Sequence, residues 1–128
     1  MILLLDTSTP TCKMTLVDDQ NKYDFEWLSE RNLAKGLLKF IHDNLLSIQK
    51  DWHEISAIGV YEGPGSFTGL RIGITVVNTI ADAQNIPIVG ASGDNWQNDA
   101  VAKINAGENA KIVLPMYGSE ANITVSRK

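Results

Sequence analysis

The stretch YEGPGSFTGLRIG, residues 61–73, carries four glycines and one proline directly before an apolar segment. A glycine-rich loop that opens a helix can bind phosphate, because backbone N–H groups and the helix N-terminus attract anions. This loop lacks the Gly-Lys-Ser/Thr ending of a Walker loop, and Pro64 has no N–H to donate. Ser66 or Thr68 suits the cap of the following helix. The pattern therefore favours a structural loop, and a nucleotide contact by Ser66 is the less favoured alternative.

Asp6 is the other residue that could take part in nucleotide chemistry, because it ends the apolar run ILLLD and begins the sequence DTST. This position resembles that of the aspartate which the actin-like ATPase superfamily places at the end of its first strand, near the metal ion and phosphates. Hydrolysis needs further carboxylates around the same cleft, and a lone Asp-x-Ser pattern does not supply them. The favoured interpretation is that Asp6 caps the turn that follows it.

The remaining residue types that could do chemistry form no recognisable constellation. The two histidines, His42 and His53, are eleven residues apart, so they do not form a His-x-x-x-His pair for a metal ion. Ser66 lies beside glycines, and the sequence places no candidate general base for it. We therefore expect no catalytic residue and no metal site in this chain.

Composition narrows the class of protein further. The 128 residues suit one domain, and the net charge of −4 gives no basic footprint for direct nucleic-acid binding. The single cysteine, Cys12, excludes an internal disulfide and lies in a strand-like stretch, which favours a buried thiol in a reducing compartment. The N-terminal MILLL is too short for a leader, and no stretch approaches a membrane span. We expect a cytoplasmic protein without membrane contact.

Hydrophobic periodicity predicts the elements that must position these residues. A meander of three antiparallel strands comes first, a helix follows, and strands then alternate with helices. The expected strands are Ile2–Asp6, Cys12–Val17, Tyr23–Leu28, Ala57–Tyr61 and one within residues 86–92. The expected helices are Leu33–Ser47, one from the glycine-rich loop to about Asn85, and one within residues 93–104.

The order β-β-β-α-β-α-β-α predicts an α/β fold with a mixed sheet, which is the order of one ribonuclease-H-like lobe. Residues 1–104 would form this lobe. Residues 105–128 would add a last strand, in KIVLPMYG, and a polar tail of the same domain.

The second helix has an unusually wide apolar arc. On a helical wheel the arc spans roughly 200°, about twice the usual core-facing stripe. Gly69 and Gly73 lie one turn apart on it and could let another backbone approach closely. Ile72 and Ala83 flank one side of the arc. Either the first helix of the same chain covers the whole arc, or a partner helix covers what the chain leaves exposed.

The sequence GPGSFTGLRIG, Gly63–Gly73, closely resembles the signature of the TsaB (YeaZ-like) family, with supporting matches in LLLDTST and IPIVGAS. The resemblance implies a ribonuclease-H-like lobe of the actin-like ATPase superfamily. It also implies a non-catalytic dimerisation subunit in tRNA threonylcarbamoyladenosine (adenosine 37) modification, whose partners are a TsaD-like catalytic subunit and a TsaE-like ATPase. The chain resembles a short form of that family, without its second lobe.

The resemblance implies docking through the first two helices. Together with the glycine stripe, it predicts an interface formed by Leu37, Leu38, Ile41, Phe67, Gly69, Leu70, Arg71, Gly73, Ile74 and Val77. ATP or ADP with magnesium would bind only at an interface with partners. Two alternatives stay open: a homodimer that uses the same helices, and a residual nucleotide-binding or hydrolytic module that uses Asp6 and Ser66.

Overall fold

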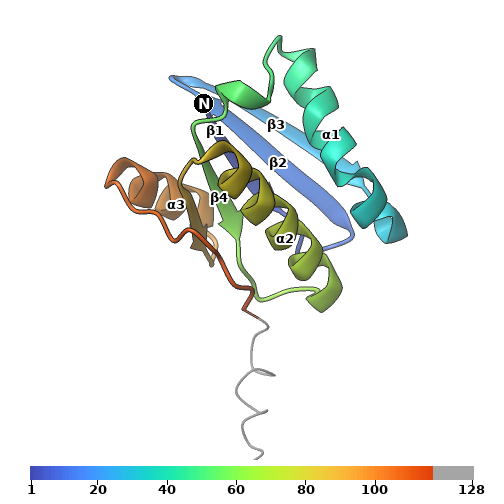
Figure 1. Ribbon diagram of the computed structural model, residues 1–128. Coiled ribbons are helices and arrows are strands. Elements are labelled where there is room, and N and C mark those ends of the chain that lie inside the picture. Colours follow the sequence, from blue (N-terminus) through green and yellow to red (C-terminus); the bar gives the residue numbers. More distant parts are fainter. Residues whose placement is uncertain (117–128) are drawn as a thin grey trace, which may run out of the picture.

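The chain folds around one five-stranded mixed sheet, and the computed structural model describes residues 1–116. The strand order across the sheet is β3-β2-β1-β4-β5 (Figure 1). The strands are β1 Ile2–Asp6, β2 Thr11–Asp18, β3 Asn21–Leu28, β4 Ala57–Tyr61 and β5 Ile88–Ala91.

Strand direction follows from the length of the connections. β1, β2 and β3 are joined by short turns and pair antiparallel, whereas β4 and β5 follow helical crossovers and pair parallel. The central strand β1 pairs on both sides: Leu4 lies opposite Thr15 of β2 and Gly59 of β4. The predicted meander and crossovers are therefore confirmed.

Helices cover both faces of the sheet (Figure 1). On one face lie α1 Leu33–Ser47 and α2 Phe67–Gln84, and on the other lies α3 Trp96–Asn105. Leu3 and Leu5 belong to the core beneath α1 and α2, while Leu4 belongs to the core beneath α3. The apolar run of β1 exists because both of its faces are buried. Two 3₁₀ turns, Glu30–Asn32 and Trp52–Glu54, complete the described elements.

The segment after α3 differs from the prediction of a last strand. Within residues 111–116 no strand forms, and residues 117–118 of the predicted strand lie outside the described residues. A side chain of α2 holds the middle of this segment: Asn78 accepts a hydrogen bond from Val113 N and donates one to Val113 O, both at 2.9 Å. Lys111 has a positive φ of 65°, which interrupts an extended ladder. The segment crosses the edge of β5 and packs on α2 instead of widening the sheet.

Candidate functional site

The glycine-rich loop makes its polar contacts within the chain. The Ser66 hydroxyl accepts a hydrogen bond from Gly69 N at 3.2 Å, so Ser66 and not Thr68 caps α2. Ser66 N donates to the carbonyl of Ser8 at 2.8 Å, and Pro64 O accepts from the Tyr61 hydroxyl at 3.0 Å. These bonds fasten the loop to β4 and to the turn after β1. They support the structural interpretation of the loop.

Asp6 caps the turn after β1, as its position suggested. Its Oδ1 accepts a hydrogen bond from Ser8 N at 2.9 Å. The carboxylate also lines a polar hollow of about 400 Å³ with Lys13, Lys22 and the residues before α3, and Ser66 is not among the residues of that hollow. Asp6 and Ser66 both bond to the backbone of Ser8, but Ser66 does not line the hollow that Asp6 lines.

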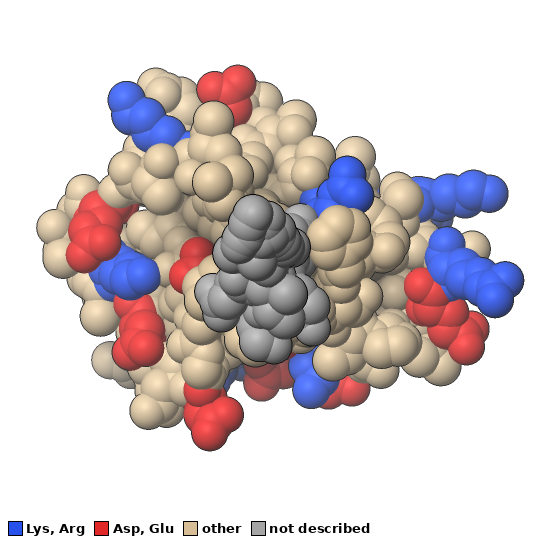
Figure 2. Space-filling view, turned by 90° about the horizontal axis from the view of Figure 1, so that it is seen from below, with Lys and Arg blue, Asp and Glu red and all other residues tan. Residues whose placement is uncertain are grey.

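Within residues 1–116, no three histidine, cysteine, aspartate or glutamate side chains lie close enough together to hold a metal ion. Among the helices of those residues, none is both long and apolar enough to span a bilayer. On the face seen in Figure 2, the basic and acidic side chains in view lie scattered toward the rim, and neither sign gathers there into a broad patch.

Cys12 is fully buried in β2. Burial, and to a smaller extent the nearby charge of Asp6, raises the pKa of its thiol to about 12. The thiolate is the reactive form, so near neutral pH Cys12 should react with iodoacetamide at least about 100-fold more slowly in the native protein than in denaturing urea. Mass spectrometry of the alkylated chain checks this. Equal rates in both conditions would contradict a buried, protonated thiol.

Half of the ten predicted interface residues lie in the chain's own core. The buried side chains are at most 2 % exposed and pack beneath α1 and α2: Leu37, Ile41, Leu70, Ile74 and Val77. The crossover connections turn these sides of both helices toward the sheet. In this structure they are unavailable to a partner, which corrects that part of the predicted interface.

The glycine stripe is also filled from within the chain. A β-carbon at Gly73 would lie 2.1 Å from Thr7 Oγ1, and one at Gly69 would lie 2.2 Å from the carbonyl oxygen of Thr7. Thr7 is 1 % exposed, and its hydroxyl donates to the Gly69 carbonyl at 2.7 Å. The close approach that the glycines permit is therefore made by the turn after β1. The prediction that this stripe admits a partner's backbone is wrong.

The other three predicted residues lie on the outer side of the helix pair. Leu38 is 54 % exposed and Phe67 53 %, and the guanidinium of Arg71 lies 5.2 Å from the centre of the Phe67 ring. An exposed leucine is unremarkable by itself. Leu38 and Arg71, however, each line one of two hollows along the seam between α1 and α2. We call this surface the two-helix face.

The hollows divide the two-helix face into two parts. The N-terminal hollow, about 380 Å³, is lined by Ala34, Thr68, Arg71, Ile72, Thr75 and Val76. The C-terminal hollow, about 530 Å³, is lined by Leu38, Lys39, His42, Trp52, Thr79, Ile80, Ala83 and Gln84.

The predicted interface did not include several residues that line these hollows. Ile72 and Val76 are only partly buried, and Ala83 is exposed. Ile72 and Ala83 do flank the apolar arc on the helical wheel, so the sequence held a signal for them. Which flank faces the sheet depends on the sheet itself and is not contained in the period of the helix.

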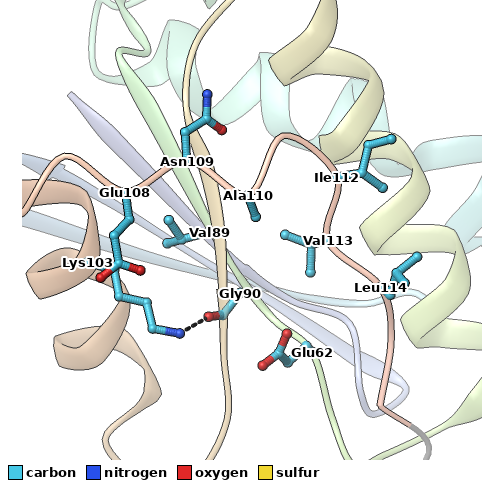
Figure 3. Close-up of a pocket in the computed structure, with 10 residues that line it drawn as sticks. All are labelled: Glu62, Val89, Gly90, Lys103, Glu108, Asn109, Ala110, Ile112, Val113 and Leu114. Atoms are coloured by element: carbon cyan, nitrogen blue, oxygen red, sulfur yellow. Dashed lines mark hydrogen bonds between the residues drawn. The ribbon is translucent and has the colours of Figure 1, made fainter.

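Another hollow, about 510 Å³, lies at the edge of β5 (Figure 3). The Lys103 ammonium, from α3, donates to the Gly90 carbonyl at 2.7 Å, and Glu62 and Glu108 also line the hollow. Asn109 Oδ1 accepts from Ile88 N at 3.1 Å. Among the described residues no further strand pairs with this edge of β5. The two contacts give its backbone carbonyl and N–H groups hydrogen-bond partners instead, so the edge is covered.

Comparison with known proteins finds similarity to proteins that are named for tRNA modification. Residues 27–95 match the family model described as TsaD, tRNA N6-adenosine threonylcarbamoyltransferase. The chain is 31 % identical over 112 residues to the tRNA threonylcarbamoyladenosine biosynthesis protein TsaB of Buchnera aphidicola subsp. Baizongia pistaciae, covering 82 % of this chain and 51 % of that protein. It is 28 % identical over 117 residues to TsaB of Escherichia coli, covering 87 % of this chain and 51 % of that protein.

A solved structure supports the same relationship. YeaZ from Pseudomonas aeruginosa superposes with a TM-score of 0.69 at 31 % identity, over 83 % of this chain and 49 % of that one. This match and the mixed sheet confirm the predicted α/β single-lobe fold. The chain spans about half the length of the curated relatives it matches.

Proposed function

The chain belongs to the family described as TsaD, tRNA N6-adenosine threonylcarbamoyltransferase, and is TsaB-like within it, and we propose that it supports tRNA threonylcarbamoyladenosine formation as a non-catalytic subunit. In this role it binds a TsaD-like catalytic subunit through the two-helix face. The assembly works in the cytoplasm and recruits a TsaE-like ATPase. ATP or ADP with magnesium binds only where partners meet.

The observation that carries this proposal is the apolar outer side of α1 and α2. Leu38 is more than half exposed, beside a seam whose two hollows are lined largely by aliphatic side chains and threonines. Water in such hollows is released when an apolar side chain enters, which stabilises association by roughly 25 cal/mol for each Å² buried. A surface of this kind suits a partner protein better than a small polar substrate.

The local chemistry supports a non-catalytic role. The two polar candidates, Asp6 and Ser66, both serve as caps of adjoining backbone. A catalytic serine or carboxylate needs a base, a metal ion or an oxyanion site within hydrogen-bond reach. The bonds of Asp6 and Ser66 instead hold the turn and the helix N-terminus in shape.

Co-expression with the TsaD-like protein of the same organism tests the proposal. The wild-type chain is expected to co-elute with that protein as a heterodimer in size-exclusion chromatography. Leu38→Glu and Val76→Glu should each weaken binding at least about tenfold, because a charge would be buried without a partner. Ala102→Glu, on the exposed side of α3, is the matched control and should bind as the wild type does.

The outcomes separate the alternatives. If no complex forms although both proteins are folded, the scaffold role is wrong. If the chain alone forms a dimer that Leu38→Glu dissociates, and the dimer excludes the TsaD-like protein, the homodimer replaces the proposal.

A further inference from the structure

The two-helix face is electrostatically asymmetric. Lys39, at the C-terminal hollow, is paired with Asp43 at 2.6 Å, and His42 Nε2 in the same hollow lies 3.4 Å from Asp51 Oδ1. Arg71 lines the N-terminal hollow and forms no ion pair with a carboxylate of residues 1–116. The C-terminal hollow is thus neutralised within the chain, and the N-terminal one keeps a positive charge.

The start of α2 adds to this charge. Helix N-termini carry about half a positive charge, and acidic residues in the first turn usually offset it. The first turn of α2 contains no acidic residue, and Arg71 is the fifth residue of this 18-residue helix. The helix dipole and the guanidinium therefore act at the same end of the face.

The Arg71 guanidinium also contacts an aromatic ring of the same helix. It lies 5.2 Å from the Phe67 ring centre, a distance that suits a cation–π contact. A guanidinium presented in this way can bind both oxygens of one carboxylate through two parallel hydrogen bonds. If an apolar partner covered Arg71 without a carboxylate, the buried charge would be uncompensated and would oppose binding.

The spacing of the hollows limits what can fill both. Residues of α2 up to Val76 line the first hollow, and residues from Thr79 onward line the second. With a rise of 1.5 Å per residue, the centres of the hollows lie about 14 Å apart along α2. One helix face spans such a distance with two side chains that are between two and three turns apart.

On the premise of the proposed function, we propose that the occupant of the two-helix face is an amphipathic helix of the partner protein with two features. It fills the two hollows with apolar side chains between two and three turns apart, and it places an aspartate or glutamate against Arg71. Arg71 is then the residue that specifies the partner and fixes the direction of its helix. In the reversed direction that carboxylate would lie at the C-terminal hollow, where Lys39 is already paired with Asp43, and Arg71 would be buried without a counter-ion.

Binding of Arg71 variants to the TsaD-like protein of the same organism tests this inference. Arg71→Glu should lower affinity at least about tenfold, and Arg71→Gln less. Arg71→Lys should be intermediate, because lysine keeps the charge but lacks the planar fork. Wild-type affinity should fall as salt rises, and that of Arg71→Gln should fall less. Arg71 is exposed, so each variant should melt at the wild-type temperature.

Charge reversal on the partner completes the test. Changing one partner Asp or Glu to Arg should restore binding to Arg71→Glu and weaken binding to the wild type. If Leu38→Glu abolishes the complex while Arg71→Glu binds like the wild type, the carboxylate inference is wrong and the docking role stands. If the wild type forms no complex, the docking role fails as well. If Arg71→Glu disrupts only a dimer of this chain, the occupant is a second copy and the inference is overturned.

Discussion

Gly73→Ala is expected to destabilise the native fold by about 1–3 kcal/mol, because the added methyl group has no space. A β-carbon at this position would lie 2.1 Å from Thr7 Oγ1 and 2.6 Å from Thr7 Cγ2. Thr7 cannot rotate away without loss, since its hydroxyl donates to the Gly69 carbonyl and its side chain is buried. Equilibrium unfolding in urea measures the effect as a fall in the midpoint.

A double-mutant cycle identifies the cause. Thr7→Ala removes the two nearest atoms, so Gly73→Ala should cost less in that background than in the wild type. Asp82→Ala, at an exposed position of α2, is the control and should leave the midpoint within about 0.5 kcal/mol of wild type. A fully stable Gly73→Ala would contradict the packing of Thr7 on α2. The glycine stripe would then be open to a partner's backbone.

Asn78→Ala is expected to lower stability by about 1–3 kcal/mol and to release the segment after α3 from α2. The Asn78 amide bonds both backbone groups of Val113, whose side chain is 4 % exposed in the core. Alanine leaves the N–H and the carbonyl of Val113 without these partners. Urea unfolding gives the loss of stability, and hydrogen exchange at Val113 reports the release.

An isosteric variant separates the two bonds of Asn78. Asn78→Asp keeps the acceptor for Val113 N but places a carboxylate oxygen against Val113 O, so it should also be destabilising. Asn98→Ala, which is exposed on α3, is the control. Unchanged exchange at Val113 in Asn78→Ala would mean that the buried Val113 side chain alone holds the segment in place.

Local patterns predicted the framework of this fold well. The bounds of β1, α1 and β4 agree with the predicted ranges, because the spacing of apolar residues in the local sequence indicates a strand or a helix. The segment after α3 was mispredicted, because its β-like apolar residues meet a side chain of α2. The bond between Asn78 and Val113 joins residues 35 positions apart, and no local period encodes such a contact.

The candidate site was predicted in part for a related reason. The resemblance assigned Leu70 and Ile74 to a partner, although the core buries them. The helical wheel showed the wide apolar arc of α2 but could not say which edge of it faces the sheet. Leu38 and Arg71 are exposed, so their place in a partner interface stays a prediction. The role of Gly73 depended on Thr7, 66 positions earlier in the chain, whose position only the folded sheet reveals.

Hydrogen exchange on the complex with the TsaD-like protein tests the central claim most directly, because it locates the contact without any mutation. The account predicts slower exchange in the outward-facing turns of α1 and α2, centred on residues 34–46 and 67–83, with α3 unchanged. Protection confined to α3 or to the edge of β5, in a complex that does form, would contradict the assignment of the two-helix face as the docking surface.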